Sequence, residues 1–188
     1  MNKMGYVIWF YGLPCSGKST LGFRLANKLA EKGIEVERLD GDLVRKTLTK
    51  DLGFSPEDRL TNIQRVAYVA GLLIDHGIFA VCSFITPTLQ MRLYLRNLFG
   101  NRLIFIFCNA PLLTCINRDN KGLYKKAIAG EINNFTGVSA PFDYKIESQL
   151  GFGDSYIHKT YLTGIGGESN SDSIVEDIIK FLEEKKMI

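Results

Sequence analysis

The sequence predicts an α/β fold in which helices cover both faces of a parallel five-stranded sheet. Short stretches of β-branched and aromatic residues alternate along the chain with stretches whose apolar residues recur at helical spacing. Strands that alternate with helices in this way form a parallel sheet, and the helices cover it. The 188 residues suffice for one substantial core and are few for two, so we expect a single domain over residues 1–188.

The first strand and the turn after it carry the clearest motif. An apolar run over residues 6–11 leads into Gly-Leu-Pro-Cys-Ser-Gly-Lys-Ser and then into a helical pattern. This is a P-loop in its required setting, because the glycines let backbone N–H groups approach a phosphate. Lys18 is expected to reach the β- and γ-phosphates, and the Ser19 hydroxyl to bind Mg²⁺. The predicted cofactor-binding residues here are Gly12, Leu13, Pro14, Cys15, Ser16, Gly17, Lys18, Ser19 and Thr20.

The remaining elements follow from periodicity and from helix-start signals. The helix after the P-loop is expected to stop at Lys32-Gly33, and a Ser-Pro-Glu-Asp start predicts another over 56–75. Together with the P-loop, these elements predict the fold of a P-loop NTPase of the nucleotide-kinase type. Further strands are expected at 34–39, 78–84, 103–108 and 160–163, and further helices at 43–50, 88–99, 111–118 and 171–186.

Two acids follow the second strand. Asp40 and Asp42 come at its carboxyl end, which is the edge of a parallel sheet where ligands bind. The third strand ends without an acid, so the carboxylate near Mg²⁺ is expected to be Asp40 or Asp42. The alternative interpretation is a polar turn in which Asp42 caps the helix 43–50.

Two further regions can be interpreted either as part of a binding site or as ordinary surface structure. Arg59 and Asn62 lie three residues apart near the start of the helix 56–75, so they either project together into a cleft or lie on the surface. Residues 119–140 are rich in Lys, Gly and Asn and hold Gly122, Gly130 and Gly137 as possible hinges. We expect a mobile lid over the phosphate site, with an ordinary solvated connection as the alternative.

Composition limits the partners. A net charge of +3 does not by itself indicate a nucleic-acid-binding surface, and no apolar run is long enough to span a bilayer. The apolar start of the chain is interrupted by Gly12 and Pro14, which argues against a signal peptide. Four cysteines without metal spacing fit a reducing compartment. We expect a cytoplasmic protein that acts on a small anionic substrate, with no nucleic-acid or membrane partner.

A P-loop alone permits several functions. The guanine-reading Asn-Lys-x-Asp motif does not occur, and the chain is short for a motor, so a small-molecule kinase is favoured. The alternative from another class is a non-catalytic nucleotide sensor. The presence of Lys18, Ser19, Asp40 and Asp42 argues against that alternative.

Several motifs in order along residues 7–141 resemble the adenylylsulfate (APS) kinase family. They are Leu39-Asp40-Gly41-Asp42-Leu43-Val44-Arg45, the run 51–59, Asn62-Ile63, Arg118-Asp119, the run 121–127 and Phe135-Thr136-Gly137. The resemblance implies transfer of the ATP γ-phosphoryl group, with Mg²⁺, to the ribose 3′-hydroxyl of a nucleoside 5′-phospho-anhydride. The usual product is 3′-phosphoadenylylsulfate (PAPS), and a homodimer is implied as well.

The resemblance also implies roles. Asp42 would accept or orient the proton of the 3′-hydroxyl, Asp40 would position Mg²⁺ with Ser19, and Lys18 and Lys121 would neutralise charge on the transferred group. Arg118 would lie over the ATP adenine. The implied substrate-binding residues are Asp42, Arg45, Phe54, Arg59, Asn62, Ile85, Thr86, Lys121 and Phe135, with the arginines gripping anions and the phenylalanines stacking on the base.

The chain departs from the family pattern around the acceptor. Ile85-Thr86-Pro87-Thr88-Leu89 stands where Ile-Ser-Pro-x-Arg is usual, and Pro141-Phe142-Asp143-Tyr144-Lys145 replaces Pro-Tyr-Glu-x-Pro. The serine sometimes proposed as a phospho-intermediate is thus absent, and direct in-line transfer is expected. A named alternative acceptor is cytidine diphosphoramidate, which an APS-kinase-like enzyme of capsule-modifying bacteria phosphorylates at the 3′-hydroxyl.

Overall fold

Five parallel strands form one sheet in the order β2-β3-β1-β4-β5. The structure is a computed structural model that describes residues 4–144, 157–160 and 171–188. The strands are β1 (Val7–Tyr11), β2 (Val36–Asp40), β3 (Phe79–Ser83), β4 (Leu103–Cys108) and β5 (Ile157–Thr160). The central strand β1 pairs Val7 with Ala80 on one side and with Leu103 on the other. The predicted parallel five-stranded sheet is confirmed.

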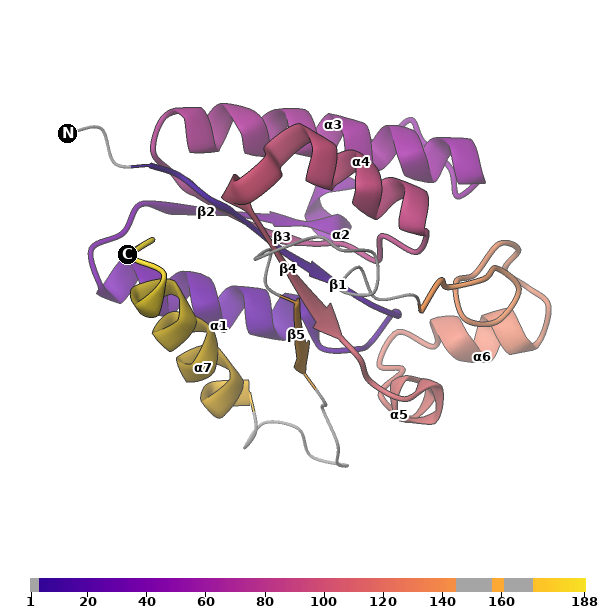
Figure 1. Ribbon diagram of the computed structural model, residues 1–188. Helices are drawn as coiled ribbons and strands as arrows, with labels where there is room; N and C mark the ends of the chain where they lie inside the picture. Colours follow the sequence, from indigo (N-terminus) through magenta and orange to yellow (C-terminus); the bar gives the residue numbers. More distant parts are fainter. Residues whose placement is uncertain (1–3, 145–156, 161–170) are drawn as a thin grey trace.

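Helices cover both faces of the sheet (Figure 1). They are α1 (Lys18–Glu31), α2 (Gly41–Val44), α3 (Pro56–Asp75), α4 (Leu89–Phe99), α5 (Leu112–Asn117), α6 (Leu123–Ile128) and α7 (Ser171–Glu184), with a 3₁₀ turn at Gly100–Arg102. Helices α3 and α4 pack on one face of the sheet, and α1 and α7 pack on the other.

The side chains of β1 alternate between two cores. Trp9 and its neighbours at odd positions pack with α3 and α4, whereas Ile8 and Phe10 pack with α1 and α7. All five residues of β1 are at most 1% exposed. A parallel strand covered on both faces is apolar without interruption, which explains why this run was recognisable in the sequence.

Two element predictions were wrong in position. The helix expected over 43–50 is the short α2, and its cap is Asp40, whose side chain accepts a hydrogen bond from the Asp42 amide. Beyond Val44 the chain forms turns, in which the Thr49 amide donates to Val44 O and the Thr49 hydroxyl is buried. Hydroxyl side chains that bond locally favour turns over helix. The fifth strand begins at 157, three residues before the expected 160–163, and 161–163 fall outside the described residues.

Other boundaries agree with the sequence signals. Ser55 accepts a hydrogen bond from the Asp58 amide and begins α3, and Thr88 accepts one from the Met91 amide and begins α4. The strands β1 to β4 all end at the same edge of the sheet, so the P-loop, Asp40, Ser83 and Cys108 come together there. In the described part of the chain, no helix combines the length and apolarity that crossing a membrane requires.

Candidate active site

The P-loop joins β1 to α1 and depends on its two glycines. Gly12 and Gly17 have φ angles of 147° and 96°, in the region that side chains disfavour. A Cβ atom on Gly12 would lie 2.5 Å from the Cys108 carbonyl oxygen. The Gly12 amide donates to Ile85 O at 3.3 Å, which fixes the loop against the chain that follows β3. Of the predicted residues, 12–17 therefore form a compact turn, and 18–20 are the first residues of α1, where an anion is favoured.

Lys18 is folded back onto this loop. Its Nζ donates to the carbonyl oxygens of Leu13 at 2.6 Å and Gly12 at 3.1 Å, and lies 3.4 Å from the Ser16 hydroxyl. The side chain is 8% exposed, and burial lowers the pKa of Lys18 below its usual value. A buried cation held by neutral carbonyls gains strongly from a phosphate, so the site favours a multiply charged anion.

The two carboxylate oxygens of Asp40 differ in their hydrogen bonding. Oδ1 accepts from the Asp42 amide at 3.0 Å, while Oδ2 is buried and has no hydrogen-bond partner among the residues that the structure describes. A buried, unpaired carboxylate oxygen fits a role beside a cation or its water shell. Within the described ranges no cluster of three or more acidic, histidine or cysteine side chains could hold a metal alone. The buried Asp40 oxygen therefore fits a place beside Mg²⁺ that arrives with a nucleotide, because Mg²⁺ keeps several waters and phosphate ligands, and the role of Ser19 as a ligand stays a prediction.

Asp42 and Lys121 form an ion pair across the site. The Lys121 Nζ donates to Asp42 Oδ2, although the residues are 79 positions apart. Both side chains are exposed, and the hydrogen bond to Asp42 raises the pKa of Lys121. The structure thus brings together two of the residues expected to act on the transferred group.

The half-buried side chains of Arg45 and Arg59 lie beside the exposed ring of Phe54 and form a cluster with it. The guanidinium carbons of Arg45 and Arg59 lie 4.3 Å and 5.7 Å from the centre of the Phe54 ring. Desolvation lowers the pKa of both arginines, and for Arg59 the nearby Arg45 lowers it further. Two cations beside an exposed aromatic ring suit a ligand that combines a flat base with anionic groups.

The loop that carries Phe54 is fastened to α3. Arg65 binds both carboxylate oxygens of Asp51, at 2.7 and 2.9 Å, and the Thr49 hydroxyl donates to Asn62 Oδ1 at 2.8 Å. Asn62 is 5% exposed and lies on the buried face of α3, not off it as expected, and its contact with the acceptor stays a prediction. Its side chain lies on the same helix face as the buried Ile63 and Val66, and there it supports the loop.

Ile85 and Thr86 connect β3 to α4 behind the P-loop. Thr86 is 1% exposed, and its hydroxyl oxygen accepts from Trp9 Nε1 at 2.8 Å. A hydroxyl used in this way is not presented to a ligand, so its assignment as a direct contact has no geometric support. Ile85 is half-buried, and its carbonyl accepts from Gly12.

The segment 119–140, which we expect to act as a lid and call the lid below, begins just after α5. Arg118 follows α5, and the Asp119 carboxylate accepts from the amides of Leu123 and Lys125, which begins α6. Figure 1 shows α5 and α6 beyond the carboxyl end of β4. Gly122, Gly130 and Gly137 all have positive φ angles and serve as turns. Arg59 donates to Asn134 O, next to Phe135, so the lid reaches the arginine cluster.

Sequence reasoning missed Arg92 in α4. This arginine is fully buried and donates to Thr86 O at 3.0 Å and to Asp143 O at 2.9 Å. Its guanidinium also lies 5.0 Å from the centre of the Tyr11 ring and 5.9 Å from that of Phe142. Arg92 thus ties together the two segments that depart from the family pattern. No motif or spacing marked it, since its partners are backbone carbonyls from distant parts of the chain.

A family model described as adenylylsulphate kinase matches residues 4–151. The chain belongs to the adenylylsulphate kinase family. Membership confirms the predicted fold and the predicted enzyme class, a phosphotransferase with an alcohol group as acceptor.

Individual relatives agree with this family. A probable adenylyl-sulfate kinase of Pseudomonas aeruginosa is 54% identical over 139 residues, which cover 74% of this chain and 64% of that protein. An adenylyl-sulfate kinase of Marinobacter nauticus is 40% identical over 188 residues, covering all of this chain and 88% of that protein. The APS kinase CysC of Mycobacterium tuberculosis, solved with AMPPNP and APS, has a TM-score of 0.83 at 36% identity and covers 96% of this chain and 98% of its own. The cytidine diphosphoramidate alternative gains no support from these relatives.

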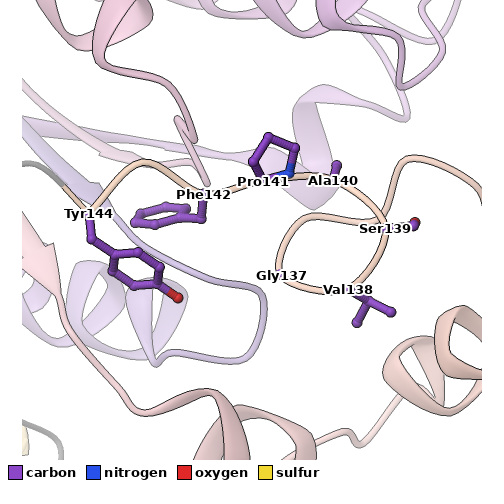
Figure 2. A pocket seen from close by; sticks show the side chains of 7 residues that line it. All are labelled: Gly137, Val138, Ser139, Ala140, Pro141, Phe142 and Tyr144. Atoms are coloured by element: carbon purple, nitrogen blue, oxygen red, sulfur yellow. The ribbon is translucent and has the colours of Figure 1, made fainter.

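A cavity of about 340 Å³ lies where the lid joins the following segment. Figure 2 shows its walls, with the turn of Gly137–Ala140 at one end and the rings of Phe142 and Tyr144 at the other. The lining residues are Gly137, Val138, Ser139, Ala140, Pro141, Phe142 and Tyr144. None of the predicted site residues lines this cavity, although Phe135 lies two positions before it.

Proposed function

We propose that the protein transfers the γ-phosphoryl group of ATP to the ribose 3′-hydroxyl of adenylylsulfate, giving PAPS and ADP. The observation that carries this function is the meeting of three groups at one sheet edge in a chain of this family. These groups are the P-loop with Lys18, the carboxylate of Asp42 and the lid cation Lys121. A nucleotide sensor needs the P-loop, but it needs no exposed carboxylate paired with a lid lysine.

The transfer is a direct in-line displacement. The 3′-oxygen forms a bond to the γ-phosphorus while the bond between that phosphorus and the β,γ-bridging oxygen breaks, and ADP leaves. The proton of the 3′-hydroxyl passes to Asp42, which is exposed and can release it to water. No residue of the protein is phosphorylated on this route, in agreement with the buried hydroxyl of Thr86.

Two lysines act on the transferred group. Lys18 leaves the carbonyls of Gly12 and Leu13 for the β- and γ-phosphates, and Lys121 leaves Asp42 for the equatorial oxygens. Mg²⁺ bound between Ser19 and the buried Asp40 would neutralise further charge on the phosphates. Both lysines gain a more highly charged partner than the one they have in the structure.

The acceptor is held by the cluster around Phe54. Arg45 and Arg59 take the phosphate and the sulfate of adenylylsulfate, while Phe54 and Phe135 stack on its adenine. The hydrogen bond from Arg59 to Asn134 O keeps Phe135 near this cluster. Arg118, at the entrance of the lid, lies over the adenine of ATP. In addition to its predicted contact with the acceptor, Asn62 supports the loop through Thr49.

The reaction is tested with purified protein, ATP, Mg²⁺ and adenylylsulfate, with product formation followed by mass spectrometry. A product heavier than the acceptor by one phosphoryl group is expected, together with an equal amount of ADP. The matched control is 3′-deoxyadenylylsulfate, which offers no 3′-hydroxyl and should give no product. Turnover of the 3′-deoxy compound, or none of adenylylsulfate, would refute the assignment.

We further propose that the protein is a homodimer, on the family resemblance alone, and that it is cytoplasmic. All four cysteines are free thiols, as a reducing compartment allows. Light scattering coupled to gel filtration measures the mass in solution. A particle near 42 kDa, twice the 21.1 kDa of one chain, is expected, and a particle of 21.1 kDa at all concentrations would contradict it.

A further inference from the structure

Tyr124 is a fully buried tyrosine in the short lid helix α6. Its hydroxyl donates to the Pro14 carbonyl oxygen of the P-loop at 3.1 Å, 110 positions away in the chain. Burial raises the pKa of Tyr124 well above its usual range, so the hydroxyl remains a donor at every physiological pH. The lid is therefore anchored on the P-loop by a partly buried hydrogen bond between two neutral groups.

This hydrogen bond sets the direction of a P-loop amide. The peptide between Pro14 and Cys15 is trans and planar, so its carbonyl oxygen and its N–H point in opposite directions. Holding the oxygen on Tyr124 therefore points the Cys15 N–H away from the lid helix. Cys15 itself has a φ of 58°, a conformation that a residue with a side chain keeps only where its surroundings hold it.

The ring of Tyr124 supports the other side of the site. Its centre lies 4.9 Å from that of Phe135, with the rings at 75° to each other. Two positions later, Gly137 packs directly on the P-loop, because a Cβ atom there would lie 2.9 Å from Leu13 Cδ2. A lid that opened as a whole about Gly122 and Gly137 would have to pull Tyr124 out of the core.

We propose that Tyr124 is a positioning residue that holds the P-loop through its hydroxyl and Phe135 through its ring. The part of this proposal that concerns the acceptor rests on the proposed function. The two contacts come from different atoms of one side chain, so they can be separated by substitution. The hydroxyl supports nucleotide binding by the P-loop, and the ring supports acceptor binding by Phe135.

The decisive variant is Tyr124→Phe, which removes the hydroxyl and keeps the ring. Calorimetric titration with AMPPNP and Mg²⁺ is expected to give a dissociation constant raised about five-fold, the effect of one neutral hydrogen bond. The KM for adenylylsulfate should be unchanged. Tyr68→Phe is the matched control, because Tyr68 is 69% exposed on α3 and losing its hydroxyl should change neither constant.

Tyr124→Leu removes both contacts and should raise the AMPPNP dissociation constant and the acceptor KM together. The melting temperature of each variant is measured alongside. A Tyr124→Phe protein with a lower melting temperature but unchanged AMPPNP affinity would overturn the proposal, because the residue would then only stabilise the fold. An acceptor KM raised as much as the AMPPNP constant in Tyr124→Phe would also overturn it.

The outcomes separate this inference from the proposed function. AMPPNP binding needs no acceptor, so the effect of the hydroxyl is measurable even if adenylylsulfate is not a substrate. If the wild-type protein fails to phosphorylate adenylylsulfate while Tyr124→Phe weakens AMPPNP binding, the proposed function fails and the role of Tyr124 in the P-loop stands.

Discussion

Lys121, which precedes α6, forms an ion pair with Asp42 in α2, so the cation and the carboxylate that we assign to the reaction neutralise each other in the structure. The hydrogen bond to Asp42 raises the pKa of Lys121, which keeps this lysine charged at neutral pH. Arrival of the γ-phosphate offers Lys121 a stronger partner and leaves Asp42 free to accept a proton. In the proposed mechanism, this ion pair is present before the nucleotide binds and separates when it binds.

Asp42→Asn should reduce kcat by roughly 10²- to 10⁴-fold, because the amide cannot accept the proton of the acceptor hydroxyl. The affinity for AMPPNP should change little, since Asp42 lies outside the P-loop. Steady-state kinetics and calorimetry measure the two quantities. Asp75→Asn is the matched control, as Asp75 is an exposed acid that pairs with Arg102. An Asp42→Asn enzyme of near full activity would remove Asp42 from the mechanism.

Lys121→Met should lower kcat on the order of 100-fold, because one cation that stabilises charge in the transition state is lost. Lys125→Met, on the exposed side of α6, should behave like the wild type. Stopped-flow measurement of a single turnover isolates the chemical step from product release. If Lys121→Met slowed only product release, the assigned contact with the transferred group would be wrong.

Proton uptake should accompany ATP binding at alkaline pH. Burial lowers the pKa of Lys18, so its deprotonated fraction grows as the pH rises through that value. The phosphates of ATP favour the charged lysine and raise its pKa again, so ATP binding draws a proton onto Lys18. Calorimetry in two buffers of different ionisation enthalpy, between about pH 7 and pH 10, measures this uptake.

Lys18→Arg is the control for this proton uptake, because a guanidinium stays protonated throughout the range. The number of protons that the variant takes up on binding ATP is subtracted from the number for the wild type. This subtraction removes the protons that ATP itself takes up or releases. An uptake that increases with pH in the wild type and is missing in the variant is expected. Equal proton balances in both proteins would mean that Lys18 is fully charged before ATP binds.

Phe54→Ala should raise the KM for adenylylsulfate about ten-fold, the effect of losing one stacked base at about 1.4 kcal/mol, with the KM for ATP unchanged. Phe23→Ala is a close control, because Phe23 is also about half exposed beneath a guanidinium, that of Arg38 at 5.0 Å, but lies on α1. If Phe54→Ala raised the KM for ATP instead, Phe54 would contact ATP and not adenylylsulfate.

The sequence was sufficient where function depends on local geometry. Gly12 and Gly17 have backbone angles that glycine favours, and Ser55 caps α3 through an amide three positions away, so a short motif contains the whole interaction. The same locality explains why β1 and α1 were placed to within one or two residues.

The sequence was insufficient where a partner comes from a distant element. Asn62 was expected to lie off the buried face of α3, because its partner Thr49 lies in a turn that the sequence did not predict. Thr86 looked available because nothing local indicates that its hydroxyl binds Trp9, 77 positions away. Arg92 carried no signal, because it binds carbonyls of two separate segments. Such contacts depend on packing, which no single stretch of sequence determines.

A competition between two acceptors shows which of them the protein phosphorylates. The wild-type protein is supplied with ATP and Mg²⁺ and offered adenylylsulfate and cytidine diphosphoramidate together, and both 3′-phosphorylated products are followed by mass. Adenylylsulfate should be consumed with a kcat/KM of about 10⁴ M⁻¹s⁻¹ or more while the cytidine compound remains. Preferential consumption of cytidine diphosphoramidate would contradict this expectation and would make the segments joined by Arg92 the determinants of a different acceptor.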